Sequence, residues 1–253
     1  MTRVAGPDFA EGNTRPTSQD VEEYFLSSPG SLTDKLASFP KFADRSSLAR
    51  FLVKYEIFKQ IQSVPGSIVE CGVNLGGGLF TWAQLSAIAE PLNHRRHVIG
   101  FDTFSGFPSV SEVDVASGND RSHVGGVTGG ALADLEHARA LYDADRPLNH
   151  IPKVHLVAGD FLETGPAWLA ANPHAVISLL YLDFDIYAPT KAAIETFLPR
   201  IPRGGIIAFD ELHAAEWPGE TQAVADTIGF ASLRWQRLPF TSICWGVVDG
   251  PRS

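Results

Sequence analysis

Apolar and polar residues follow two spacings along the chain, one typical of helices and one typical of buried strands. Between Leu48 and Ile61, apolar residues recur at helical spacing, which predicts an amphipathic helix that runs to about residue 63. Ser46 and Ser47 can cap its start. Two shorter helical patterns precede it, at residues 21–26 and 32–36.

From residue 67 onward, short apolar runs alternate with helical stretches. The run at 175–183 is almost continuously apolar, as expected for a strand buried on both faces. Strands are predicted at 67–72, 96–102, 153–160, 175–183 and 204–210, helices at 79–90, 131–142, 165–172, 189–198 and 219–228, and one hairpin or two late strands at 233–249. This alternation predicts an α/β fold, a doubly wound and mostly parallel sheet with right-handed crossovers.

The same patterns divide the chain into segments. Residues 1–20 hold few apolar residues and are expected to form a mobile N-terminal arm. Residues 21–64 carry the N-terminal helices, and residues 65–253 form one catalytic domain. Within it, residues 108–130 are rich in Gly, Ser and Asp and are expected to form an active-site lid loop.

Composition narrows the classes of partner. The net charge of −9 disfavours nucleic acid and anionic membranes. The sequence has no apolar run of about 18 residues, so no membrane span is expected. The start of the chain lacks the apolar core of a signal peptide, and two cysteines are too few for a disulfide scaffold. We therefore expect a cytoplasmic protein with reduced thiols.

Acidic residues end the predicted parallel strands. Glu70, Asp102, Asp160, Asp183 and Asp210 each lie at or beside the carboxyl end of a strand. In an open parallel sheet these ends meet at one edge, where ligands bind. Asp is also a common capping and turn residue, which is the structural alternative for each of them. Five carboxylates on one edge repel one another unless a ligand or cation satisfies them.

The turn after the first strand indicates the kind of ligand. Glycines at 72 and 76–78 let the backbone approach a ligand closely, but their spacing is not that of a dinucleotide fingerprint. Asp102 is placed to accept hydrogen bonds from ribose hydroxyls. A nucleoside without a pyrophosphate, such as S-adenosyl-L-methionine, fits better than the cofactor of an NAD-dependent oxidoreductase, and its positive charges favour an acidic pocket.

A second acidic group follows two later strands. Asp183, Asp210 and Glu211 could converge as hard oxygen ligands of Mg²⁺. Asp185 can face the cleft beside the metal once the chain turns, or it can cap the following helix or face water. His123 and His213 are alternative bases, although nothing in their spacing pairs them with another group, so a solvated or structural role is favoured.

Several motifs resemble one enzyme family over roughly residues 65–230. They are Val69-Glu-Cys-Gly-Val73, Gly76-Gly77, Phe101-Asp-Thr-Phe-Ser-Gly-Phe-Pro108, Gly159-Asp-Phe-Leu-Glu-Thr164, Leu182-Asp-Phe-Asp-Ile-Tyr187 and Gly204-Gly-Ile-Ile-Ala-Phe-Asp-Glu211. They are similar to those of the macrocin O-methyltransferase (TylF-type) family. The resemblance implies a class I S-adenosylmethionine-dependent methyltransferase with a Rossmann-like, seven-stranded sheet and an N-terminal helical extension.

The resemblance also implies roles for residues. Carried over by position, it makes Asp185 the general base. It assigns cofactor contacts to Glu70, Gly72, Asp102, Ser105 and Asp160, and metal coordination to Asp183, Asp210 and Glu211. The chain departs from the family where Asp210-Glu211-Leu212 replaces the usual Asp-Asp-Tyr, where Gly78 replaces a common Ser, and in the uncharged stretch 242–248.

The expected function is therefore Mg²⁺-assisted O-methylation of a hydroxyl, in the family a sugar hydroxyl of a natural product. The expected partner is a small, glycosylated acceptor. The sequence leaves open whether identical chains assemble into an oligomer. Two alternatives remain: a methyltransferase for a phenol, carboxylate or peptide hydroxyl, and a non-catalytic nucleoside-binding module of the same fold.

Overall fold

The computed structural model describes residues 17–249, which belong to two compact units with a boundary between Leu48 and Ala49. The expected arm at 1–20 lies almost wholly outside the described residues. In the first unit, α1 (Ser18–Ser27) and α2 (Leu32–Ala37) form where helical patterns were predicted, and a short 3₁₀ turn (Phe39–Lys41) follows. Thr17 with Asp20 and Ser31 with Asp34 form capping boxes at the two helix starts.

The amphipathic helix is α3 (Arg45–Ile61), which begins in the first unit and continues in the second. Its start is capped by Asp44, whose side chain accepts hydrogen bonds from the backbone amides of Ser46 and Ser47. The two serines are therefore the donors to the cap and not the cap itself. Val53, Ile57, Phe58 and Ile61 of this helix are buried in the core of the second unit. Phe51, Leu52 and Tyr55, which belong to the predicted apolar stripe, are exposed.

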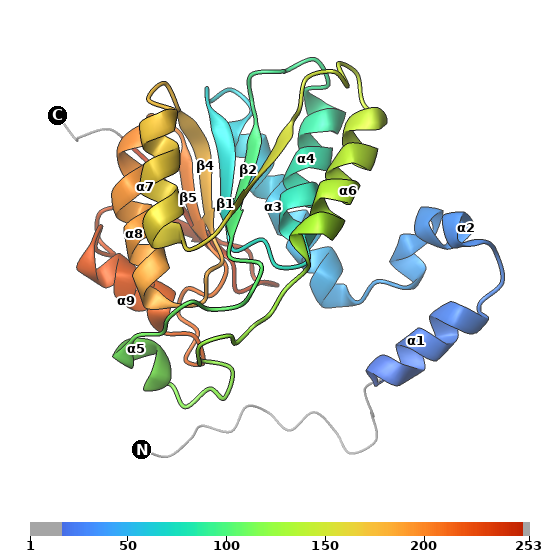
Figure 1. The fold of residues 1–253 in the computed structure, drawn as a ribbon, viewed down its shortest axis with the longest axis horizontal. Helices are drawn as coiled ribbons and strands as arrows, with labels where there is room; N and C mark the ends of the chain where they lie inside the picture. The colour runs from blue at the N-terminus through green and yellow to red at the C-terminus, as the bar shows by residue number, and fades with distance from the viewer. Residues whose placement is uncertain (1–16, 250–253) are drawn as a thin grey trace. The chain divides into compact units, whose positions relative to one another are not determined.

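A seven-stranded sheet forms the centre of the second unit (Figure 1). Its strands are β1 (Ser67–Cys71), β2 (Val98–Asp102), β3 (Val154–Ala158), β4 (Ile177–Leu182), β5 (Ile206–Phe209), β6 (Arg234–Arg237) and β7 (Cys244–Val247). The strand order is β3-β2-β1-β4-β5-β7-β6. β1 to β5 are parallel and β7 is antiparallel to both β5 and β6, so residues 233–249 form a hairpin, one of the two arrangements expected there. The predicted doubly wound, mostly parallel sheet is confirmed.

Helices cover both faces of this sheet, as Figure 1 shows. The remaining long helices are α4 (Gly77–Ala89), α6 (Leu132–Ala144), α7 (Phe161–Ala171), α8 (Tyr187–Phe197) and α9 (Gly219–Asp226). α3, α4 and α6 pack on one face and α7, α8 and α9 on the other. Leu179 and Tyr181 point to the first face and Leu180 and Leu182 to the second, so β4 is buried on both sides, as its continuous apolar run predicts.

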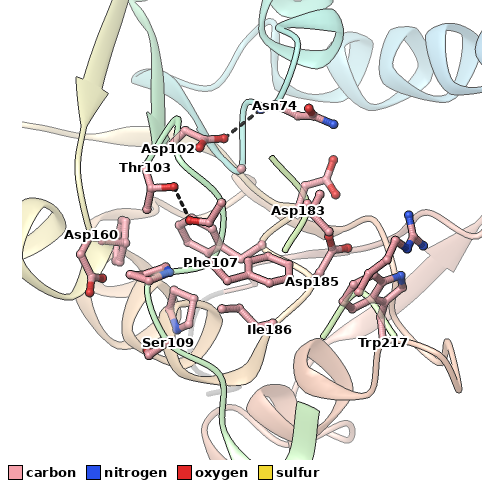
Figure 2. Close-up of a pocket in the computed structure, with 18 of the residues that line it drawn as sticks. Asn74, Asp102, Thr103, Phe107, Ser109, Asp160, Asp183, Asp185, Ile186 and Trp217 are labelled. Carbon is pink, nitrogen blue, oxygen red and sulfur yellow. Dashed lines mark hydrogen bonds between the residues drawn. The ribbon is translucent and has the colours of Figure 1, made fainter. Parts of the chain in front are cut away.

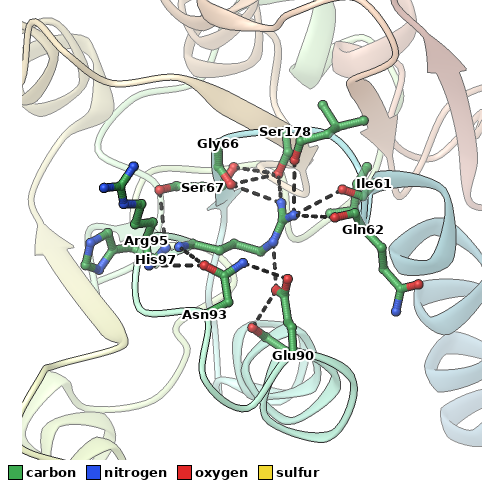
Figure 3. A network of polar contacts seen from close by, with 12 residues as sticks. Ile61, Gln62, Gly66, Ser67, Glu90, Asn93, Arg95, His97 and Ser178 are labelled. Atoms are coloured by element: carbon green, nitrogen blue, oxygen red, sulfur yellow. Dashed lines mark hydrogen bonds and ion pairs between the residues drawn. The ribbon is translucent and has the colours of Figure 1, made fainter. Parts of the chain in front are cut away.

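A buried arginine links several segments at the end of the sheet where the parallel strands begin (Figure 3). The Arg96 guanidinium is 3% exposed, and its Nε lies 2.7 Å from Glu90 Oε1 at the end of α4. Its two Nη atoms donate to Ser178 Oγ in β4 and to the carbonyl oxygens of Ile61, Gln62, Val64 and Gly66. A planar group with five donors satisfies carbonyls of α3 and of the turn before β1 at once.

The expected lid segment, residues 108–130, is ordered by one buried acid. Asp114 lies in a short helix, α5 (Glu112–Val115), and is 1% exposed. One of its oxygens accepts from the backbone amide of Tyr187 at 2.9 Å, in the first turn of α8, and the other accepts from Ser111. The segment is thereby fastened beside the carboxyl end of β4. Among residues 17–249, none of the helices has the length and apolar character needed to cross a bilayer.

Candidate active site

A cavity of about 350 Å³ lies at the carboxyl edge of the sheet, where the acids were expected to gather. Figure 2 shows Asp102 and Asp160 toward one side of it and Asp183 and Asp185 toward the other. The turn after β1 contributes Gly72 and Asn74, the segment after β2 contributes Thr103 and residues 106–109, and Arg50, Arg121, Glu211 and Trp217 also line it. Segments more than a hundred residues apart in sequence therefore share one pocket.

On one side of the pocket, Asp102 organises the backbone around it. Its Oδ2 accepts from the amides of Val73 at 2.7 Å and Asn74 at 2.8 Å, and its Oδ1 accepts from the amide of Phe104 at 2.7 Å. The carboxylate at the end of β2 thus holds the glycine turn after β1 in place. Each carboxylate oxygen has more than one lone pair, so Asp102 can still accept from a ligand hydroxyl.

Asp160 and Gly72 complete this side of the pocket. Asp160 is the N-cap of α7, and its Oδ1 accepts from the amide of Leu162 at 2.9 Å. Asp160 therefore has the capping role that was the alternative for a strand-end acid, and it lines the pocket as well. Gly72 has φ +90° and packs its α-carbon against the Asp183 carbonyl.

Two residues expected to contact the cofactor do not line the cavity. Glu70 is 1% exposed and accepts from the indole Nε1 of Trp82 at 2.6 Å, beneath the start of α4. Burial raises the pKa of Glu70 to about 7, while Lys54 and the Trp82 hydrogen bond act in the other direction. Ser105 is exposed, and its backbone amide donates to Thr103 Oγ1. Gly72, Asp102 and Asp160 are thus the expected cofactor residues that the structure brings together.

The other side of the pocket concentrates acidic groups. Asp185 has φ +63°, a backbone conformation that non-glycine residues adopt mainly where structure or function requires it. Burial, followed by the charges of Glu211 and Asp210, raises the pKa of Asp185 to about 7. Burial and the charges of Asp210 and Asp185 also raise the pKa of Asp183 well above its usual range. A proton is therefore held easily at this end of the pocket.

Asp210 is fully buried behind the cavity wall and is held on both of its oxygens. Oδ1 accepts from the hydroxyl of Tyr181 in β4, and Oδ2 accepts from Arg50 Nη2 in α3 at 2.6 Å. The same Nη2 lies 3.7 Å from Glu211 Oε1. Arg50 was not predicted as a site residue, because a helical arginine 160 positions from its partner carries no local signal.

Two further charged residues of this cluster were also missed. Glu220, in α9, is fully buried, and its Oε2 accepts from the amide of Glu211 at 2.9 Å. Its Oε1 has no hydrogen-bond partner among the described residues. Lys54, one turn after Arg50 in α3, is 4% exposed and lies 3.4 Å above the ring centre of Tyr181. Its position within an apolar stripe was the signal that could have identified it.

The acidic end suits a cation chemically, but its ligands are not assembled around one. Carboxylate oxygens are the ligands that Mg²⁺ prefers, and Glu220 Oε1 is a buried oxygen without a hydrogen-bond partner among the described residues. Within residues 17–249, however, no three His, Cys, Asp or Glu side chains are arranged as metal ligands. The positive charge of Arg50 Nη2 already lies 2.6 Å from Asp210 Oδ2, so Arg50 would repel an ion at that oxygen unless it moved.

Residues of the expected lid segment line the pocket together with Trp217. The Arg121 guanidinium lies 5.1 Å from the ring centre of Trp217, and Phe107 meets the same indole edge-on at 6.0 Å. Asn119 Nδ2 donates to the Glu216 carbonyl at 3.2 Å. His123 and His213 are exposed and do not line the cavity, as a solvated role for them requires.

The sequence of the second unit matches a known family. Residues 53–230 match the family model described as macrocin-O-methyltransferase (TylF). The chain belongs to this family. The resemblance drawn from the motifs is thereby confirmed, and with it the class I methyltransferase fold. The enzyme class expected from the sequence, an S-adenosylmethionine-dependent O-methyltransferase, is the class of this family.

Individual relatives agree with this assignment. A crystal structure of CalS11, a calicheamicin methyltransferase, is 31% identical with a TM-score of 0.86, over 95% of this chain and 99% of that one. A tetracenomycin 4'-O-methyltransferase from Streptomyces olivaceus, whose named substrate carries a dimethoxy-rhamnosyl group, is 32% identical over 151 residues, 58% of this chain. The match spans about half the length of that relative, 53%. The O-methyltransferase NovP, at 19% identity and a TM-score of 0.64 over 79% of this chain and 80% of that one, shares the fold.

Proposed function

We propose that this protein transfers the methyl group of S-adenosylmethionine to a hydroxyl of a deoxysugar, in the synthesis of a glycosylated natural product. The observation that carries the proposal is the position of Asp185, which lines the pocket across from Asp102 and Asp160. The names of two relatives support the sugar. One is a methyltransferase for a rhamnosyl tetracenomycin, and a second CalS11 structure, 30% identical with a TM-score of 0.78 over 92% of this chain and 96% of that one, is described as a TDP-rhamnose 3'-O-methyltransferase.

The acids at one end of the pocket bind the cofactor, and those at the other end act on the acceptor. Asp102 accepts from ribose hydroxyls and keeps the glycine turn against the nucleoside, while Asp160 lies beside it. The negative charge of the whole pocket favours a ligand that carries sulfonium and ammonium groups. Glu70 and Ser105, which do not line the cavity, act on the cofactor only through the turns that they support.

Asp185 acts as the general base in this proposal. A sugar hydroxyl is a weak nucleophile, and its attack on a methyl group requires removal of its proton. A carboxylate whose pKa is about 7 can accept a proton near neutral pH more readily than an ordinary Asp. The left-handed backbone at Asp185 fixes the direction of its side chain, and correct alignment supplies much of the rate.

The proposal includes a Mg²⁺ ion bound beside Asp185. Asp183, Asp210 and Glu211 would hold the ion, and a bound Mg²⁺ would favour the ionised form of the acceptor hydroxyl.

Trp217, Phe107 and Arg121 would contact the acceptor, because they border the end of the pocket that holds Asp185. A cytoplasmic location fits two free cysteines, Cys71 and Cys244.

The test measures methyl transfer by mass spectrometry with two acceptors, a nucleoside-diphosphate rhamnose and a rhamnosylated aromatic polyketide. We expect the wild-type protein to methylate at least one of them. Asp185→Asn should lower kcat by about 10² to 10⁴ while S-adenosylhomocysteine still binds. Glu195→Gln, which removes an exposed carboxylate from α8, is the matched control and should keep full activity.

The outcomes separate the alternatives. Transfer to a phenol or carboxylate but to neither sugar would replace the acceptor class. Cofactor binding without transfer to any acceptor would favour the non-catalytic module. Full activity of Asp185→Asn would remove Asp185 from the role of base. EDTA should stop the reaction and Mg²⁺ restore it, and activity that EDTA leaves unchanged would contradict the metal requirement.

A further inference from the structure

Arg50 lies where a metal ion is expected, at the acidic end of the pocket. Its Nη2 lies 2.6 Å from Asp210 Oδ2 and 3.7 Å from Glu211 Oε1, so one guanidinium nitrogen bridges two adjacent carboxylates. These are two of the three side chains expected to hold a divalent ion. Asp210 is fully buried and cannot exchange this partner for water in place. Its other oxygen accepts from Tyr181, so a metal ion bound at Oδ2 would lie close to the positive charge of Arg50 and be repelled by it.

Arg50 itself can leave. Its side chain is 45% exposed, in contrast to the fully buried Asp210. A long arginine side chain that already reaches solvent can rotate away while its helix stays in place. The neighbouring cation of α3, Lys54, is 4% exposed and packs on Tyr181, so it lacks this freedom. Of these two cations, Arg50 is therefore the one that can be exchanged.

Even with Lys54 and Arg121 nearby, Arg50 leaves the five carboxyl groups of this cluster short of positive charge. Asp183, Asp185 and Glu220 also face this region, and Glu220 Oε1 has no hydrogen-bond partner among the described residues. A divalent ion brings twice the charge of Arg50 into the same space and can coordinate several oxygens at once. Exchange of Arg50 for such an ion would relieve more of the mutual repulsion than Arg50 does alone.

We propose that Arg50 is an internal counter-ion, which holds Asp210 and Glu211 in the metal-free protein and must move off them before a divalent cation binds. The inference rests on the metal dependence in the proposed function. It gives Arg50 a positioning role: the residue keeps the acidic pair ordered in the absence of metal and sets how tightly metal binds. If Arg50 holds the pair in about nine molecules of ten, removing it should tighten apparent metal binding about tenfold.

The experiment measures Mn²⁺ binding to the full-length protein by electron paramagnetic resonance, without cofactor or acceptor. Arg50→Met removes the competing charge, and Lys59→Met removes an exposed cation from the same helix as the matched control. Arg50→Met is expected to bind Mn²⁺ about tenfold more tightly than the wild type, and Lys59→Met like the wild type. The double variant Arg50→Met/Asp210→Asn should lose the gain, and circular dichroism melting of each variant verifies folding.

Each outcome has one meaning. Equal or weaker Mn²⁺ binding by Arg50→Met overturns the role of Arg50 and leaves the proposed function intact. A gain that persists in the double variant also overturns it, because the gain would then arise elsewhere. Absence of Mn²⁺ binding in the wild type and in Arg50→Met removes the metal from the proposed function, and the inference falls with it. A tenfold gain confined to Arg50→Met supports both.

Discussion

Gly72 and Asp183 touch through their backbones. A Cβ placed on Gly72 would lie 1.9 Å from the carbonyl oxygen of Asp183, and Gly72 has φ +90°. The amide of Asp183 donates to the Cys71 carbonyl at 2.8 Å, which continues the pairing of β1 with β4 one residue past the end of β4. The turn on the cofactor side of the pocket and the acidic segment on the acceptor side are therefore a single packed unit.

This contact predicts the effect of Gly72→Ala. The methyl group would require both a backbone shift and a left-handed alanine, each of which is costly. We expect a loss of about 1 to 3 kcal/mol in the free energy of unfolding, together with weaker S-adenosylhomocysteine binding. Gly77→Ala is the control for stability, because a Cβ at position 77 would have nothing within 4 Å and Ala favours a helix. Urea denaturation that gave equal stabilities for the two variants would contradict this close approach.

Asp102→Asn tests whether a strand-end acid acts by supporting the turn. An amide offers one acceptor oxygen where the carboxylate has two, so the hydrogen bonds from Val73 and Asn74 or the one from Phe104 would be lost. Hydrogen bonds to a charged group contribute about 1.5 to 3 kcal/mol, which corresponds to a loss of roughly 10- to 100-fold in S-adenosylhomocysteine affinity. Asp134→Asn, an exposed acid of α6, should bind as the wild type does. Unchanged affinity in Asp102→Asn would exclude Asp102 from the site.

Much of the fold was predictable because its signals are local. The continuous apolar run of β4 required burial on both faces, and the alternation of strands with helices required parallel strands whose carboxyl ends share an edge. That edge brought Asp102, Asp160 and Asp183 into one pocket without any knowledge of tertiary contacts.

The partners of these acids were not predictable, because they come from segments that are distant in sequence. Asp210 is bound by an arginine 160 positions earlier, and Glu70 points under α4 to Trp82 because the side chains of a strand alternate between faces. Arg96, which joins α3, α4 and β4, has no sequence signal beyond its charge. Strand ends can be located by pattern, whereas the direction of each side chain depends on packing between distant segments.

Asp114→Ala should loosen the lid segment and leave the cofactor side of the pocket intact. The buried amide of Tyr187 would lose its acceptor, at a cost of about 1 to 3 kcal/mol. We expect faster amide hydrogen exchange in residues 108–126 and in the first turn of α8, a higher KM for the acceptor and little change in cofactor affinity. Glu112→Ala, an exposed residue of the same short helix, should behave as the wild type. Faster exchange spread evenly over the protein would indicate general destabilisation instead.

The acidic cluster predicts how stability depends on pH. The pKa values of Asp185 and Glu70 are raised to about 7, and those of Asp183 and Glu220 are raised well above their usual range. The folded protein therefore keeps protons that the unfolded chain has already released. Each such proton lowers the free energy of unfolding by about 1.4 kcal/mol per pH unit as the pH rises. Stability should therefore fall as the pH rises from about 5, above the pKa values of the unfolded chain, and the loss caused by Asp185 and Glu70 should be nearly complete at about pH 8.

Above about pH 6.5, the buried histidines no longer contribute to the pH dependence of stability, so a fall there reports on the carboxyl groups. Burial lowers the pKa of His97 and of His155, so those groups favour folding as the pH rises, but their effect ends once the unfolded histidines are also neutral, near pH 6.5. Thermal melting from about pH 6.5 to pH 8 should show a falling midpoint for the wild type and for Glu195→Gln. Asp185→Asn should show a shallower fall, since one of the retained protons is gone. A midpoint that does not fall with pH in any of the three proteins would mean that these carboxylates are already ionised in the folded state, and Asp185 would then be an ordinary acid.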